Sequence, residues 1–383
     1  MGTPVSNRKR ILFVDDESAI LAGLQNLLYK DRKRWDLVFA LGGDEALRQI
    51  RAASFDVVIS DMRMPGLDGA AVMQVVKNEC PTTVRIMLSG YADGDAVKRA
   101  LPVVHQFLSK PCDIKTLRAA IERCLSHLDV DRDLRLRDLV EGVDRLPTPP
   151  DIYFELTRRL QSPTASVGGV ADVVARDPAL TAKLLQLVNS AYFGNSTKTT
   201  SIPQAVRQLG MDRLRYLALT SVFSGSTGME EARGLSLKDM QRDALRVANT
   251  ARDLAAPSEQ DDAFAAALLH DIGYLVLARH PGVDFGQFCT RAQRGEPPLD
   301  VERELFGVTH ADVGARLLAV WGVPAATIDA VQYHHDPGSA PEACRKLASI
   351  VHVADALTTH SPVSVPLNQE SLGLAGFASL YPR

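Results

Sequence analysis

Acidic, hydroxyl and basic residues end a series of short apolar runs in the first 125 residues. Asp15 and Asp16 end ILFVDD, and Asp61 ends DVVISD. Ser89 lies near the end of RIMLSG, and Lys110 follows QFLS. Carboxylates are the ligands that Mg²⁺ prefers. A carboxylate beside Mg²⁺ and a lysine can attack a phosphoryl group, because both cations neutralise the charge that builds up. These residue types therefore predict a phosphoryl-transfer site, in which Ser89 hydrogen-bonds a phosphoryl oxygen.

Short strands separated by amphipathic helices would bring these side chains together. The expected strands are residues 11–16, 36–41, 56–61, 85–90 and 106–111. Strands that alternate with helices at this spacing predict a parallel, doubly wound sheet. Functional groups gather at the carboxyl ends of the strands in such a sheet. A single acid could merely cap a helix, but five residues at matching strand ends favour a site.

A second group of residues that could do chemistry lies in the other half of the chain, where seven of the nine histidines follow residue 269. Its members are His270, Asp271, His310, His334, His335 and Asp355. On several helices, such residues can bind one or two transition metals in a bundle core, and a bridging hydroxide could then attack a phosphodiester. The alternative is a hydrogen-bond network, because buried histidines and acids are costly unless each finds a partner.

Residues from about 112 onwards have a helical pattern. Asp113 is the expected N-cap of the first helix, and a charged run follows, which is either a solvated linker helix or a short coiled coil. LPTPPD (146–151) breaks the pattern and marks a domain start. Beyond it we expect no strand, only an all-helical domain in two lobes with a boundary near residue 225.

Composition narrows the class of protein. The 383 residues allow two or three domains, and 46% hydrophobic with 23% charged residues is ordinary for a soluble protein. The net charge of −3 and the lack of a basic half predict no basic surface that would bind the phosphates of DNA. Five scattered cysteines predict reduced thiols, and no apolar stretch approaches the ~18 residues of a membrane span. We therefore expect a cytoplasmic protein that binds neither DNA nor membrane.

The motifs VDDE, DMRMPGLDG, SG and KP occur in order, and residues 9–127 resemble a response-regulator receiver domain. The resemblance implies a flavodoxin-like fold with five parallel strands. It also implies that Asp61 is the phosphoacceptor for a sensor histidine kinase.

The same resemblance implies the other residues of the receiver site. The Mg²⁺ ligands would be Asp16, Asp61, the carbonyl group of Arg63 and, through water, Asp15. Ser89 and Lys110 would form the switch pair. Phe107 occupies the aromatic switch position, although an ordinary buried strand aromatic is the other interpretation.

The later motifs resemble an HDOD domain, an output domain related to the HD superfamily. LPTPPDIYFELTRRLQSPTAS, ARDPALTAKLLQLVNSAYFG, AALLHDIGYLVL, ELFGVTHADVGARLLAVWGVP and YHHDP carry this resemblance over residues 146–360. It implies a helical linker (128–145), an N-terminal lobe (146–224) and an HD-like lobe (225–383). It also implies a regulatory module that contacts a downstream protein. Whether two chains pair through the linker as a homodimer is a separate question that the resemblance leaves open.

The HD-GYP cyclic dinucleotide phosphodiesterases, which are catalytic relatives, differ from this chain at three places. Asp243 aligns with their first histidine and completes the candidate HD site. Tyr274 replaces the lysine of HDIGK, and HHDPGSAPE stands in place of GYP. Losing an imidazole removes a ligand, and losing the lysine leaves developing phosphate charge without a stabiliser. We expect a hydrogen-bond network with at most a weakly held transition metal and no turnover. The alternatives are a receiver-gated phosphodiesterase and a DNA-binding regulator.

Overall fold

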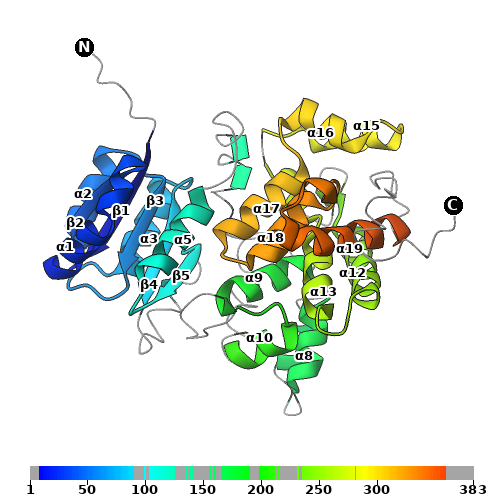
Figure 1. Ribbon diagram of the computed structural model, residues 1–383, viewed down its shortest axis with the longest axis horizontal. Helices are drawn as coiled ribbons and strands as arrows, with labels where there is room; N and C mark the ends of the chain where they lie inside the picture. The colour runs from blue at the N-terminus through cyan, green and yellow to red at the C-terminus, as the bar shows by residue number, and fades with distance from the viewer. Residues whose placement is uncertain are drawn as a thin grey trace. The chain divides into compact units, whose positions relative to one another are not determined.

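A computed structural model describes much of the chain as two compact units, one within residues 8–125 and one within the described residues from 135 onwards (Figure 1). The described residues are 8–89, 99–100, 103–125, 135–136, 139–140, 143, 155–156, 158–160, 162, 165–189, 198–211, 214, 231–232, 235–280 and 282–358. Most of the predicted linker helix, the breaker at 146–151 and the lobe boundary near residue 225 lie outside the described residues.

The first unit contains a parallel sheet with the strand order β2-β1-β3-β4-β5. Its strands are β1 (Lys9–Asp15), β2 (Trp35–Leu41), β3 (Val57–Asp61), β4 (Val84–Ser89) and β5 (Gln106–Ser109). The central strands are apolar and buried, as in Ile11, Val58 and Ile86. Burial on both faces is typical of a parallel sheet. The predicted five-stranded, doubly wound sheet is confirmed.

Helices follow the strands of this sheet along the chain. They are α1 (Ser18–Leu27), the 3₁₀ helix η1 (Tyr29–Lys33), α2 (Gly43–Ala52), α3 (Gly69–Glu79) and α5 (Ile114–Leu125). Asp113 accepts hydrogen bonds from the backbone N–H groups of Lys115 and Thr116 at 2.8 and 2.9 Å. These bonds satisfy donors that the first turn of α5 leaves free. Asp113 therefore caps α5, as its position in the sequence predicts.

The second unit is mostly helical. Its helices are α8 (Val167–Val174), α9 (Pro178–Val188), α10 (Ile202–Leu209), α12 (Leu237–Leu254), α13 (Gln260–Leu269), α14 (Ile272–Leu277), α15 (Phe285–Gln293), α16 (Pro298–Phe306), α17 (His310–Val320), α18 (Ala325–Tyr333), η3 (Pro337–Ser339) and α19 (Glu342–Thr358). The prediction that no strand follows residue 151 was wrong, because β6 (Glu231–Ala232) and β7 (Leu235–Ser236) form an antiparallel pair. Two-residue strands are too short for an alternating pattern to show in the sequence.

Helices α14 and α17 approach each other closely through two glycines. A methyl group on Gly273 would lie 2.8 Å from the carbonyl carbon of His310 and 2.9 Å from the backbone nitrogen of Gly314. Carbon atoms normally stay about 3.5–4.0 Å apart. Because these positions lack a side chain, the His270–Asp271 turn before α14 can lie beside the first turn of α17.

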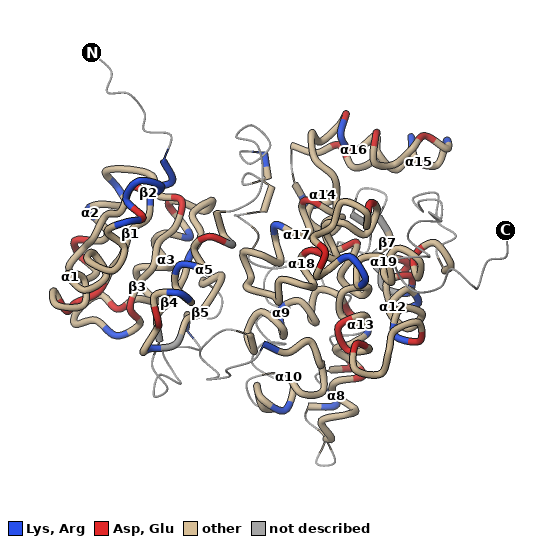
Figure 2. The backbone as a smooth tube through the Cα atoms, viewed as in Figure 1, with Lys and Arg blue, Asp and Glu red and all other residues tan. Residues whose placement is uncertain are grey.

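Charged residues of both signs are interspersed over the described chain (Figure 2), in keeping with the net charge of −3. Among the described helices, none combines the length and the apolar character that crossing a bilayer requires.

Candidate functional sites

The carboxyl ends of three strands of the five-stranded sheet form the first candidate site. Asp15 ends β1, Asp61 ends β3 and Lys110 follows β5. The Lys110 Nζ lies 3.0 Å from Oδ2 of Asp15 and 2.8 Å from Oδ1 of Asp61. The two acids are only 1% and 8% exposed. One ammonium group therefore bridges two buried carboxylates, as the sequence predicts from the strand ends.

The charges at this site depend on one another. Burial raises the pKa of Asp61, and the bond to Lys110 offsets this only in part. Burial alone would lower the pKa of Lys110, but the hydrogen bonds to Asp61 and Asp15 outweigh it, so this pKa is raised. Two buried acids that share one cation favour a further cation beside them. Together with Asp16, the acids offer the oxygen donors that suit Mg²⁺.

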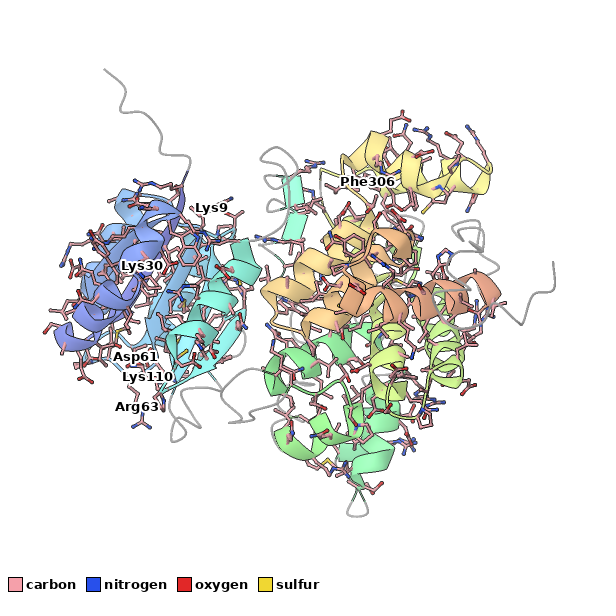
Figure 3. The ribbon with its side chains drawn as sticks, viewed as in Figure 1. Lys9, Lys30, Asp61, Arg63, Lys110 and Phe306 are labelled. Atoms are coloured by element: carbon pink, nitrogen blue, oxygen red, sulfur yellow. The ribbon has the colours of Figure 1, made fainter. Side chains whose placement is uncertain are left out.

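The remaining predicted receiver residues occupy different environments. Asp16 is exposed directly after β1. Arg63 is exposed in the loop after β3, at the same edge as Asp61 and Lys110 (Figure 3). Phe107 is buried in β5, which suits both of its interpretations. Ser89 ends β4, but its side chain lies outside the described residues.

Gly69 belongs to the first site and was not predicted from the sequence. It begins α3, and its backbone N–H donates a hydrogen bond to the carbonyl oxygen of Met62 at 3.1 Å. A methyl group there would overlap the backbone of Asp61, with its carbonyl carbon 2.9 Å away. A glycine at this position lets α3 start directly against the end of β3 at Asp61. The DG dipeptide in DMRMPGLDG was the available signal.

The second candidate site brings six of the seven predicted HD-site residues together. They are His270 at the end of α13, Asp271 before α14, His310 at the start of α17, His334 and His335 after α18, and Asp355 in α19. Asp271 lies at the centre, with Oδ1 3.1 Å from Nε2 of His310 and Oδ2 3.2 Å from Nε2 of His270. The Nε2 of His270 also lies 3.7 Å from Oδ1 of Asp355.

Asp243 behaves differently from the other six. It lies in α12, and its carboxylate pairs with Arg246 at 3.3 Å and with Arg242 at 3.8 Å. Across the described part of the chain, no contact joins Asp243 to the histidine cluster. The acid that aligns with the missing histidine therefore forms ion pairs along its own helix.

Glu302 is a member of the second site that the sequence does not reveal. Its side chain is fully buried. It accepts hydrogen bonds from the hydroxyl group of Tyr274 at 2.6 Å, the backbone N–H of His310 at 2.7 Å and Nδ1 of His310 at 2.9 Å. In VERELFG it stands among charged residues typical of an exposed helix, so no local pattern marks it. His352 was also missed; its Nδ1 lies 2.8 Å from the carbonyl oxygen of His334.

Burial and charge divide the histidines into two kinds. Burial lowers the pKa of His310, but Glu302 and Asp271 outweigh this and raise it to about 10. The pKa of His270 is likewise raised, because Asp271 and Asp355 outweigh its burial. Burial and the neighbouring imidazoles lower the pKa values of His334 and His335.

Burial and the neighbouring imidazoles also set the charge of Asp271, which lies between these histidines. Burial alone would raise the pKa of Asp271, but His270 and His310 lower it well below its ordinary value. At neutral pH the cluster without metal therefore contains imidazolium, imidazole and carboxylate groups side by side.

Two domain families match the chain. The response regulator receiver domain matches residues 11–122, and the HDOD domain matches residues 146–337. An uncharacterized protein of Treponema pallidum is 28% identical over 282 residues, which cover 69% of this chain and 54% of that protein. The transcriptional regulatory protein ZraR of Escherichia coli O157:H7 is 32% identical over 123 residues, 31% of this chain and 27% of ZraR. The chain thus spans about half or less of these relatives.

Solved structures share the fold. A virulence factor from Campylobacter jejuni aligns with a TM-score of 0.54 and 22% identity, over 66% of this chain and 92% of that chain. A fragment of the MmoQ response regulator from Methylococcus capsulatus aligns with a TM-score of 0.50 and 24% identity, over 63% and 93%.

Proposed function

The chain belongs to the HDOD domain family and carries a response-regulator receiver domain, and we propose that phosphorylation of Asp61 by a sensor histidine kinase sets its state. The observation that carries this proposal is the Lys110 ammonium group, which lies within 3.0 Å of the carboxylates of both Asp15 and Asp61. An acid that is buried beside a fixed cation is prepared to take up a dianionic group.

The residues at the strand ends have separate roles in this transfer. A carboxylate oxygen of Asp61 supplies the electron pair that forms the new O–P bond, and the bond between phosphorus and the donor imidazole breaks with its electrons leaving on nitrogen. Lys110 stays beside Asp61 and neutralises the charge on the phosphoryl oxygens. Asp15, Asp16 and Asp61 would hold Mg²⁺, which supplies further positive charge at those oxygens.

The helical unit would carry the output, by changing its contacts with a downstream protein when Asp61 is phosphorylated. A receiver-gated phosphodiesterase is the second candidate, and the cluster of histidines around Asp271 favours it. Two observations support the regulatory role instead. The hydroxyl group of Tyr274, at the position of the catalytic lysine, is bound to Glu302, and Asp243 is paired with arginines.

A phosphorylation assay on the full chain tests the proposal. Acetyl phosphate with Mg²⁺ should add one phosphoryl group, detected by mass spectrometry of the intact protein. Asp61→Asn should abolish this addition. Asp44→Asn, which changes an exposed acid at the start of α2, is the matched control and should label as the wild type does. Labelling that persists in Asp61→Asn contradicts the assignment. Cleavage of a cyclic dinucleotide by the wild type but not by His270→Ala would favour the phosphodiesterase.

A further inference from the structure

Partners outside the histidine cluster fix which ring nitrogens carry hydrogen. The Nδ1 of His270 lies 2.7 Å from the carbonyl oxygen of Ala267, and the Nδ1 of His334 lies 2.7 Å from that of Val331. A carbonyl oxygen only accepts, so each Nδ1 carries a hydrogen and Nε2 of the neutral ring keeps its lone pair. These Nε2 atoms lie 3.2 and 4.0 Å from the carboxylate oxygens of Asp271. This is the tautomer in which histidine binds a metal through Nε2.

The inner nitrogens lie so close together that a proton or a cation must lie between them. The Nε2 of His310 lies 3.0 Å from Nε2 of His335 and 3.5 Å from Nε2 of His334. Lone pairs at these distances repel, so without metal the proton on protonated His310 lies between them, and a metal ion can take the place of that proton. In addition, Nδ1 of His335 is buried and has no hydrogen-bond partner among the described residues. Imidazole and carboxylate donors in this arrangement fit a transition-metal ion.

The candidate ligands form two groups that cannot both bind an ion as complete groups. Two groups have ligand atoms within 4.8 Å of one another, namely His310, His334 and His335, and His270, Asp271 and His334. His334 belongs to both groups. Its Nδ1 is committed to Val331, so only its Nε2 is available, and a single lone pair binds one ion.

Glu302 holds one of these ligands in place. Its carboxylate accepts hydrogen bonds from the backbone and from Nδ1 of His310, and Tyr274 donates a third. The Tyr274 ring also stacks on the His310 ring, with the centroids 4.1 Å apart and an angle of 21° between the planes. The imidazole is thus fixed in its plane by Glu302 and against its face by Tyr274. Carboxylates that orient a metal-binding histidine in this way change metal affinity about 10–100-fold.

We propose that the cluster binds one transition-metal ion, and that Glu302, supported by Tyr274, is the positioning residue that presents Nε2 of His310 to it. This inference concerns residues of the helical unit alone. It does not depend on Asp61, so either proposal can fail without the other.

Titration of the metal-free full chain with Co²⁺ tests the inference, because the visible absorption of bound Co²⁺ reports its ligands and competition with Zn²⁺ reports affinity. The wild type should bind one ion. Glu302→Gln should weaken binding about 10–100-fold and change the Co²⁺ spectrum. Glu304→Gln, on the same helix but exposed and paired with Arg291, is the control and should bind as the wild type does. Asp61 phosphorylation should be unchanged in both variants.

Two milder variants keep the test valid if Glu302→Gln does not fold, as judged by circular dichroism. Tyr274→Phe keeps the stacked ring and removes one donor to Glu302, so a smaller loss of affinity is expected. His335→Gln replaces a half-buried ligand and should change the Co²⁺ spectrum. The inference is overturned if the wild type binds no ion or two ions, or if the spectrum and affinity stay unchanged in these variants.

Discussion

Replacing Gly273 by alanine should force helices α14 and α17 apart. The added methyl group would overlap the carbonyl oxygen of His310 and lie 2.8 Å from its carbonyl carbon and 2.9 Å from the nitrogen of Gly314. Normal contact needs about 3.5 Å or more, so the helices must separate by roughly 1 Å. Overpacking of this kind costs about 1–3 kcal/mol. We expect the upper end, because backbone atoms cannot rotate away as a side chain can.

The helix preference of alanine partly offsets this cost. Alanine is about 0.5–1 kcal/mol better than glycine inside a helix, which leaves a net loss of about 2 kcal/mol for Gly273→Ala. Gly168→Ala supplies the matched control, because Gly168 lies in α8 with nothing within 4 Å of its added methyl group. That variant should gain about 0.5–1 kcal/mol. The two variants should therefore differ by about 3 kcal/mol.

Urea denaturation followed by tryptophan fluorescence measures this difference in the helical unit. The chain has two tryptophans. Trp35 belongs to the receiver sheet, and Trp321 is buried after α17. In a Trp35→Phe background, Trp321 reports the helical unit alone, which avoids treating two units as one transition. A free energy of unfolding for Gly273→Ala within 0.5 kcal/mol of the parent would refute the close packing of α14 on α17.

Two further predictions concern a buried histidine and a cysteine. His270→Ala should lower the free energy of unfolding of the metal-free helical unit by about 1–3 kcal/mol, because it leaves buried partners of His270 unpaired. Urea denaturation followed by Trp321 fluorescence measures this loss, and an unchanged denaturation midpoint would contradict the hydrogen-bond network. Burial, with a smaller effect of Asp113, raises the pKa of Cys112 from 9.0 to about 11. This lowers the thiolate fraction of Cys112 at pH 8 about 100-fold. A thiolate of higher pKa is also a stronger nucleophile, which raises the rate of each thiolate about 10-fold. Alkylation of Cys112 by iodoacetamide, followed by peptide mass spectrometry, should therefore be about 10-fold slower than that of an ordinary thiol. The alkylation rate should keep rising with pH until about pH 11. An inflection near pH 9 would contradict the shift.

The sequence by itself determined the parallel sheet of the first unit and the residues that end its strands. Alternating strand and helix periods predicted the parallel sheet, and parallel strands place their carboxyl ends at one edge. The proximity of Asp15, Asp61 and Lys110 therefore followed from their positions at strand ends. Helix caps such as Asp177, which accepts a hydrogen bond from Ala179 at 2.8 Å, are also local. The chemistry that a cap needs lies within a few residues.

Only the tertiary structure decided that Asp243 stays outside the helical site and that Glu302 belongs to it. Asp243 aligned with a metal ligand, yet it pairs with Arg242 and Arg246 along its own helix. Glu302 resembles a surface residue in its sequence, yet it is buried against Tyr274 and His310. The physical reason is that a helix's periodicity shows which residues share a face, but not which distant helix that face contacts. Packing between elements, made possible here by glycines such as Gly273, sets those partners.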